Sequence, residues 1–97
     1  MRAIERDVIA QTRFMLWNRS GGRCEVCGKR LDFETFQMAH RIPQRKWLLK
    51  KYGKSIIHHP KNLAATCSLR CNGAVSIAGN PVAMEQLAQE ISEELNV

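Results

Sequence analysis

The sequence lacks any unbroken apolar run long enough to span a membrane or to serve as the apolar core of a signal peptide. Charged residues interrupt even its apolar N-terminal stretch, at Arg2, Glu5, Arg6, Asp7 and Arg13. We therefore expect a soluble protein with a cytoplasmic, intracellular location.

Acidic residues are missing from the middle of the chain. No Asp or Glu lies between the first and last of eight cations, which are Arg41, Arg45, Lys46, Lys50, Lys51, Lys54, Lys61 and Arg70. The last eighteen residues show the reverse, with four Glu and no Lys or Arg. A cationic stretch can simply be a solvated face, but this one is long and free of acids, which favours contact with nucleic acid. The cations expected to contact phosphates are Arg41, Arg45, Lys46 and Lys61.

Large side chains are also scarce, since only 6% of the 97 residues are aromatic. A chain of this size forms one domain, here residues 1–97, and buries only a modest core, so an additional covalent or metal staple is expected. Five of the six aromatic residues are expected to fill the centre rather than to stack on bases; they are Trp17, Phe33, Phe36, Trp47 and Tyr52.

Four cysteines provide candidates for that staple. Cys24 and Cys27 are separated by two residues, Cys67 and Cys71 by three, and thirty-nine residues lie between the pairs. Closely spaced pairs in a reducing compartment are typical of metal ligands, with free thiols or disulfides as the alternatives. Four thiolates would complete a tetrahedral zinc site and leave no position for substrate, so the predicted zinc is structural.

Periodicity and turn residues predict four helices and two strands. They are a helix over 2–19, a strand over 33–40, a basic helix over 44–52, a second strand over 55–58, a helix from about Cys67, and a helix over 81–95.

The two terminal helices are expected to be amphipathic packing elements. Asn80-Pro81 is a typical helix start, and the apolar stripe behind it is Met84, Leu87, Ala88, Ile91 and Leu95. The N-terminal stripe is Ile4, Val8, Ile9, Met15 and Leu16. Either stripe could instead join a second copy or another partner, so a homodimer stays open.

Three motifs make the chain resemble the HNH, or ββα-metal, endonuclease family. They are Ala39-His40-Arg41-Ile42-Pro43, His59-Pro60-Lys61-Asn62-Leu63, and the segment from Cys67 to Asn72. The resemblance covers the core, residues 22–72. It implies an α+β fold: a small ββα-metal (HNH-like) zinc-stapled domain, here flanked by the N- and C-terminal amphipathic helices.

The resemblance also implies catalytic roles. His40 would be the general base, Asn62 would brace the hairpin loop, and Asn72 would support the site. Ala39 and Asn72 occupy the positions where the family usually holds its catalytic ion, which could be Mg²⁺, Mn²⁺, Ni²⁺ or Zn²⁺. His58 or His59 could replace a missing ligand, and His59 is the candidate we name.

The leading hypothesis is therefore an endonuclease that hydrolyses phosphodiester bonds in DNA, double-stranded DNA in the first instance. One alternative is a degenerate HNH fold that binds nucleic acid without cleaving it, and another is a module that docks a protein partner. Simpler roles are also open: His40 could be a bonded strand-end residue, His58 and His59 could pack in a loop, and Asn62 could cap a turn.

Overall fold

The computed structural model describes the backbone of residues 3–96 and the side chains of residues 8–96. Within that range the fold is α+β, with five α-helices, one short 3₁₀ helix and two strands. In chain order these are α1 (Ala3–Ser20), β1 (Gln37–His40), α2 (Lys46–Tyr52), α3 (Lys54–Ile57), η1 (Pro60–Asn62), β2 (Leu63–Thr66), α4 (Leu69–Val75) and α5 (Pro81–Leu95).

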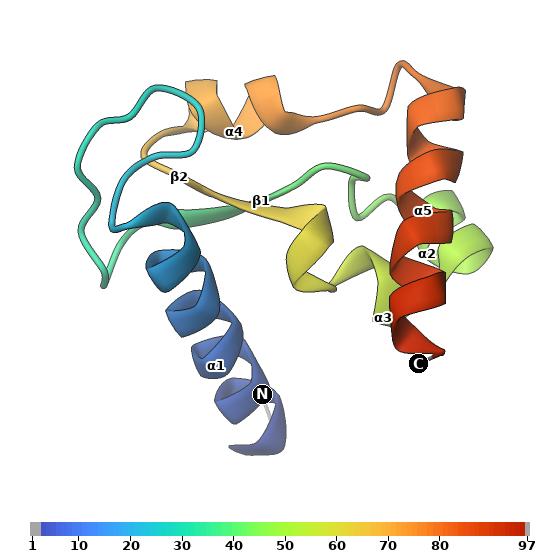
Figure 1. Cartoon of the computed structure of the whole chain (residues 1–97), viewed down its shortest axis with the longest axis horizontal. Coiled ribbons are helices and arrows are strands. Elements are labelled where there is room, and N and C mark those ends of the chain that lie inside the picture. Colours follow the sequence, from blue (N-terminus) through green and yellow to red (C-terminus); the bar gives the residue numbers. More distant parts are fainter. Residues whose placement is uncertain (1–2, 97) are drawn as a thin grey trace.

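The two strands form an antiparallel sheet that lies between α1 and α4 (Figure 1). In the register His40 lies opposite Leu63, and Gln37 lies opposite Thr66. Side chains alternate along a strand, so Met38 and His40 share one face of the sheet while Gln37 and Ala39 share the other. This alternation determines which neighbours His40 can reach.

Two hydrophobic clusters hold the chain together on either side of the sheet. The first joins α1 to the cysteine-bearing segments; its buried members are Leu16, Cys24, Leu31, Phe36, Leu63, Ala65 and Cys71. The second joins α5 to α2 and α3; its buried members are Ile42, Leu48, Ile57, Met84, Leu87, Ala88 and Ile91. Four of the five predicted stripe residues of α5 are thus buried, while Leu95 is exposed.

Asn62 connects the two halves of the segment between the strands. Its side chain is fully buried. The amide oxygen accepts from the backbone N–H of Ile42 at 2.8 Å, and the amide nitrogen donates to the carbonyls of Ile42 and Ile57 at 3.0 and 2.8 Å. These three buried bonds hold the ends of the 42–57 segment together.

Replacing Asn62 by alanine should therefore destabilise the protein by about 3 kcal/mol, because it leaves one N–H and two carbonyls buried without partners. Urea unfolding of the wild type and the variant measures this change. Asn72→Ala is the matched control, since Asn72 is only half-buried and makes one side-chain hydrogen bond, to Gln37. Equal shifts for the two variants would contradict the bracing role of Asn62.

Several sequence predictions need correction. The second strand is Leu63–Thr66, and the predicted strand over 55–58 lies mostly in helix α3. The first strand begins at Gln37, because Asp32 accepts from the N–H groups of Glu34, Thr35 and Phe36 and closes a turn before it. The helix after β2 starts at Leu69 with Ser68 as its N-cap, so Cys67 precedes the helix.

The terminal and basic helices also differ from their predictions. Helix α1 extends to Ser20, and the predicted start at Arg2 and the side chain of Ile4 lie outside what is described. Of its stripe only Leu16 is buried, while Val8, Ile9 and Met15 are exposed. Helix α2 begins at Lys46, after the extended backbone of Arg45. None of the described helices is both long and apolar enough to cross a membrane.

The aromatic residues divide between core and surface. Trp17 packs edge-on against Phe33 and at a tilt against Phe36, with ring centroids 5.3 and 6.0 Å apart. Trp47 is 56% exposed on α2, so the prediction that it packs in the centre was wrong. Leu48, its neighbour, is fully buried and takes that place in the second cluster.

Candidate functional site

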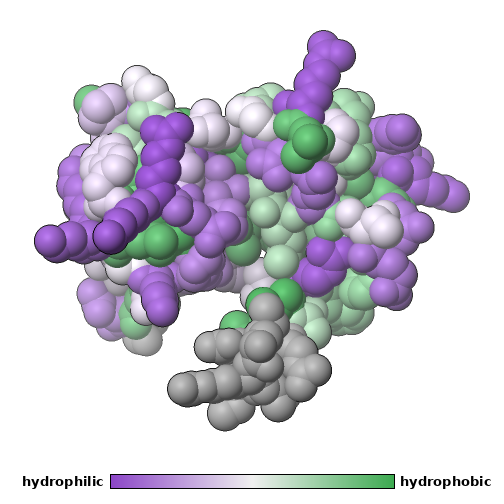
Figure 2. Space-filling view, turned by 180° about the vertical axis from the view of Figure 1, so that it is seen from behind, coloured by the Kyte–Doolittle hydropathy of each residue, from purple (hydrophilic) through white to green (hydrophobic). Residues whose placement is uncertain are grey.

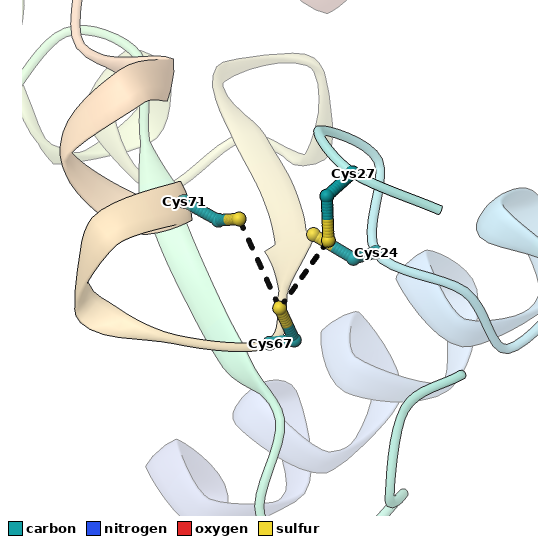
Figure 3. Close-up of side chains that lie close together, drawn as sticks. All are labelled: Cys24, Cys27, Cys67 and Cys71. Atoms are coloured by element: carbon teal, nitrogen blue, oxygen red, sulfur yellow. Dashed lines mark hydrogen bonds between the residues drawn. The ribbon is translucent and has the colours of Figure 1, made fainter. Parts of the chain in front are cut away.

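The four cysteine sulfurs converge on one point although they come from three segments of the chain (Figure 3). All four ligand atoms lie within 4.8 Å of one another. The Sγ atom of Cys67 lies 3.5 Å from that of Cys27 and 3.8 Å from that of Cys71. Four sulfurs bound at the zinc–thiolate distance would be separated by about 3.8 Å, so the cluster could hold a structural metal ion such as zinc.

Local turns place these sulfurs. Gly28, at φ 80°, closes the Cys24–Cys27 turn, and its N–H donates to the carbonyl of Cys24 at 2.9 Å. On the other side, the Ser68 hydroxyl accepts from the N–H of Cys71 at 3.3 Å and caps α4. The cap turns Cys71 back toward Cys67, so that the sulfurs of this second pair approach each other.

The protonation of the cysteines also indicates a cation site. Burial opposes ionisation of Cys24, but backbone N–H groups of Cys27, Val26 and Cys67 outweigh it and lower the pKa of Cys24 to about 6. The Ser68 hydroxyl lowers the pKa of Cys71, yet burial and the three other cysteines outweigh it and raise this pKa to about 12. Ionisation is thus favoured at Cys24 and opposed at Cys71, and a bound divalent cation would stabilise the thiolate form of both.

His40 forms a pair with His58. Their rings meet nearly edge to face, and Nε2 of His40 lies 3.2 Å from Nδ1 of His58. The amide nitrogen of Gln44 lies 3.5 Å from the other ring nitrogen of His40. The pair forms because β1 ends at His40 while α3 ends just before His58, so the two element ends meet.

The pKa of His40 is lowered from 6.5 to about 4, first because the ring is partly removed from water and second because His58 would repel a positive charge. His40 is therefore neutral at physiological pH. A neutral imidazole can accept a proton, which a general base requires.

The pair lies in a groove of about 720 Å³ between α1 and the His40–His58 side of the sheet. We call this space the histidine groove. Its lining residues are Val8, Ile9, Thr12, Arg13, Phe36, Gln37, Met38, His40, Gln44, Lys54, His58 and Leu63. The groove is thus mainly apolar, with cations and amides at some positions and the histidine pair among them.

The other predicted site residues lie elsewhere. Asn72 donates to the side-chain oxygen of Gln37 at 3.0 Å, on the sheet face opposite His40. Asn62 is buried and acts through the backbone around it. His59 caps η1 by accepting from the N–H of Lys61, and its Nε2 lies 3.9 Å from Glu94 on α5. Of the two adjacent histidines, it is His58 that the structure brings to His40.

The predicted phosphate-contacting cations differ in their surroundings. Arg45 and Lys46 are exposed and have no ion-pair partner among residues 8–96. Lys61 forms an ion pair with Glu94 at 2.9 Å. Arg41 lines a separate cavity of about 400 Å³ that it shares with Lys61, Arg19 and Glu25.

Comparison with known proteins gives no relatives: no family model, no curated protein and no solved structure matches the chain.

Proposed function

We propose that the protein is an endonuclease that hydrolyses phosphodiester bonds in DNA with the help of a divalent ion, and that the cysteine cluster binds one structural zinc. The observation that carries the proposal is the contact between neutral His40 and the His58 ring at an open groove. An uncharged, paired imidazole at a groove is a recognisable candidate for a general base.

The zinc assignment is supported by the donor set. Four sulfurs within 4.8 Å of one another suit a soft, tetrahedral ion, and zinc is the common one. With all four positions taken by protein, this ion would hold the Cys24 turn to β2 and α4. Its proposed contribution is stability.

The hydrogen bond within the histidine pair determines which nitrogen of His40 would act as the base. Donation from Nε2–H of His40 to Nδ1 of His58 leaves the lone pair of His40 on Nδ1. The amide nitrogen of Gln44, 3.5 Å from Nδ1, would donate to this lone pair until the attacking water takes its place.

In this arrangement Nδ1 of His40 takes a proton from the attacking water. His58 then accepts a hydrogen bond from Nε2–H of His40, which keeps the ring in place and spreads the positive charge that it gains. His58 is thus a positioning residue for His40. This role explains why the two rings face each other at hydrogen-bond distance.

The residues at the family's ligand positions fit a catalytic ion poorly. Ala39 has no donor atom and is 1% exposed, and Asn72 offers one neutral amide oxygen on the sheet face opposite His40, where its amide nitrogen donates to Gln37. These two positions therefore provide no complete ligand set for a divalent ion, whose chemistry, when bound, would be to neutralise the charge that develops on the phosphate.

The resemblance to HNH nucleases supports the same reaction. The order β1, β2, α4 is a hairpin followed by a helix, with the four cysteines at its far end, as that family implies. Exposed Arg45 and Lys46 follow His40 closely in the chain and would contact neighbouring phosphates. Lys61 would do so only after leaving Glu94.

A second candidate function is nucleic-acid binding without cleavage. It is favoured by the Gln37–Asn72 hydrogen bond and by Ala39, which together fill the place where two metal ligands would be needed. This candidate predicts affinity that falls steeply with salt and a substrate that stays intact.

Plasmid cleavage tests the proposal. Protein whose zinc content has been confirmed is treated with chelator under conditions that leave the cysteine zinc bound, and Mg²⁺, Mn²⁺, Ni²⁺ or Zn²⁺ is then added separately. We expect nicked and linear DNA with at least one ion and none without. Plasmid that is bound but intact with every ion would overturn the nuclease and favour the binding module.

A further inference from the structure

The histidine groove has an apolar character that a base for water activation does not need. Val8 and Ile9 of α1 line one side and are 56% and 37% exposed, and Met38 and Leu63 line the sheet side. Its volume of about 720 Å³ lies within the range of small-molecule pockets. Figure 2 shows one face of the molecule, on which hydrophobic and hydrophilic areas alternate.

We propose that this groove receives an unstacked nucleobase, so that the preferred substrate is unpaired or locally opened DNA. The inference rests on the proposed function, since it names the substrate of the same site. It goes against the simpler expectation of an intact duplex.

Duplex DNA would make poor use of the groove. Its outer surface is sugar and charged phosphate. Placing phosphates against Val8, Ile9 and Met38 would strip hydration water from the phosphates, and these apolar side chains offer no hydrogen bonds to replace it. A base swung out of the stack has two apolar faces that would bury against such a wall. The apolar lining therefore favours an extruded or single-stranded nucleotide.

The polar residues of the groove suit the rest of a nucleotide. Gln44 provides an amide that can bond to the edge of a base. Arg13 and Lys54 contribute positive charge, and no acid is among the lining residues that are described. Arg13 donates to the backbone carbonyls of Phe33 and Phe36, and no carboxylate among residues 8–96 pairs with it. A partly apolar, anionic ligand complements this surface.

The test compares two variants on α1 that carry the same new charge. Ile9→Glu places a carboxylate on the groove wall, whereas Met15→Glu places it on a different hollow lined by Ala10, Gln11 and Phe14. Both positions are exposed, so both variants should fold. Binding is measured with chelator present, so that no cleavage is needed, by the fluorescence anisotropy of labelled oligothymidylate and of an abasic strand of equal length and charge.

The wild type and Met15→Glu should bind the strand with bases at least about tenfold more tightly than the abasic strand, the effect of stacking about one base. Ile9→Glu should lose most of this ratio. Equal affinity for the two strands in the wild type, or an unchanged ratio in Ile9→Glu, would overturn the inference.

Two further outcomes separate this inference from the nuclease itself. If binding depends on the bases but no ion supports cleavage, the groove is a base site and the nuclease proposal is rejected. If intact duplex is cleaved as fast as bubbled duplex, the nuclease proposal stands and the base site is rejected. A wild-type dimer in sedimentation that Ile9→Glu converts to monomer would assign the apolar wall to a second copy of the chain and overturn the inference.

Discussion

Replacing Cys67 by serine should unfold the protein at room temperature. Cys67 lies 3.5 and 3.8 Å from the sulfurs of Cys27 and Cys71, so it is the sulfur through which the two pairs meet. Structural zinc contributes about 10–16 kcal/mol in zinc-finger peptides, whereas a whole domain is stable by only about 5–15 kcal/mol. Far-UV circular dichroism with zinc quantification should show loss of helix and of the ion together.

The control for this prediction is Val26→Ser, which changes an exposed side chain between Cys24 and Cys27 without removing a ligand. It should retain zinc and the melting temperature of the wild type within a few degrees. A Cys67→Ser protein that melts like Val26→Ser would show that the hydrophobic clusters suffice and that the cluster is not a structural zinc site.

Much of the metal cluster and α5 could be predicted because their signals are local. The spacing of Cys24 and Cys27 fits a tight turn about one ion, and the stripe of Met84, Leu87 and Ile91 has a clear helical period. Asn80 caps α5 through its side chain, as the Asn-Pro pair predicts.

The strand assignments depended on tertiary contacts that local patterns do not contain. Leu63–Thr66 is buried at all four positions, so it has no alternation to reveal a strand, and two of its residues are alanine. Ile56 and Ile57 suggest a strand by propensity, but packing of Ile57 against α5 holds the segment in helix α3. The helix also determines that His58, rather than His59, faces His40.

Replacing His40 by alanine should lower the rate of DNA cleavage about 10²–10⁴-fold, the usual contribution of a general base. The loss should appear in the cleavage rate more than in affinity for DNA, because the cations expected to bind phosphates are unchanged. His58→Ala should lower the rate less, because His58 orients the His40 ring and does not itself receive the proton. Single-turnover cleavage with the most active ion, beside anisotropy binding, measures both quantities.

The most direct measurement of the proposed function is the single-turnover rate of DNA cleavage by His40→Ala and by His59→Ala. The second variant is the control, because the imidazole of His59 faces α5 instead of the groove. Circular dichroism and zinc content first establish that both variants are folded. We predict that His59→Ala cleaves within a fewfold of the wild type while His40→Ala is nearly inactive. His40→Ala protein that cleaves DNA at the wild-type rate would contradict the assignment of the His40–His58 pair as the catalytic centre.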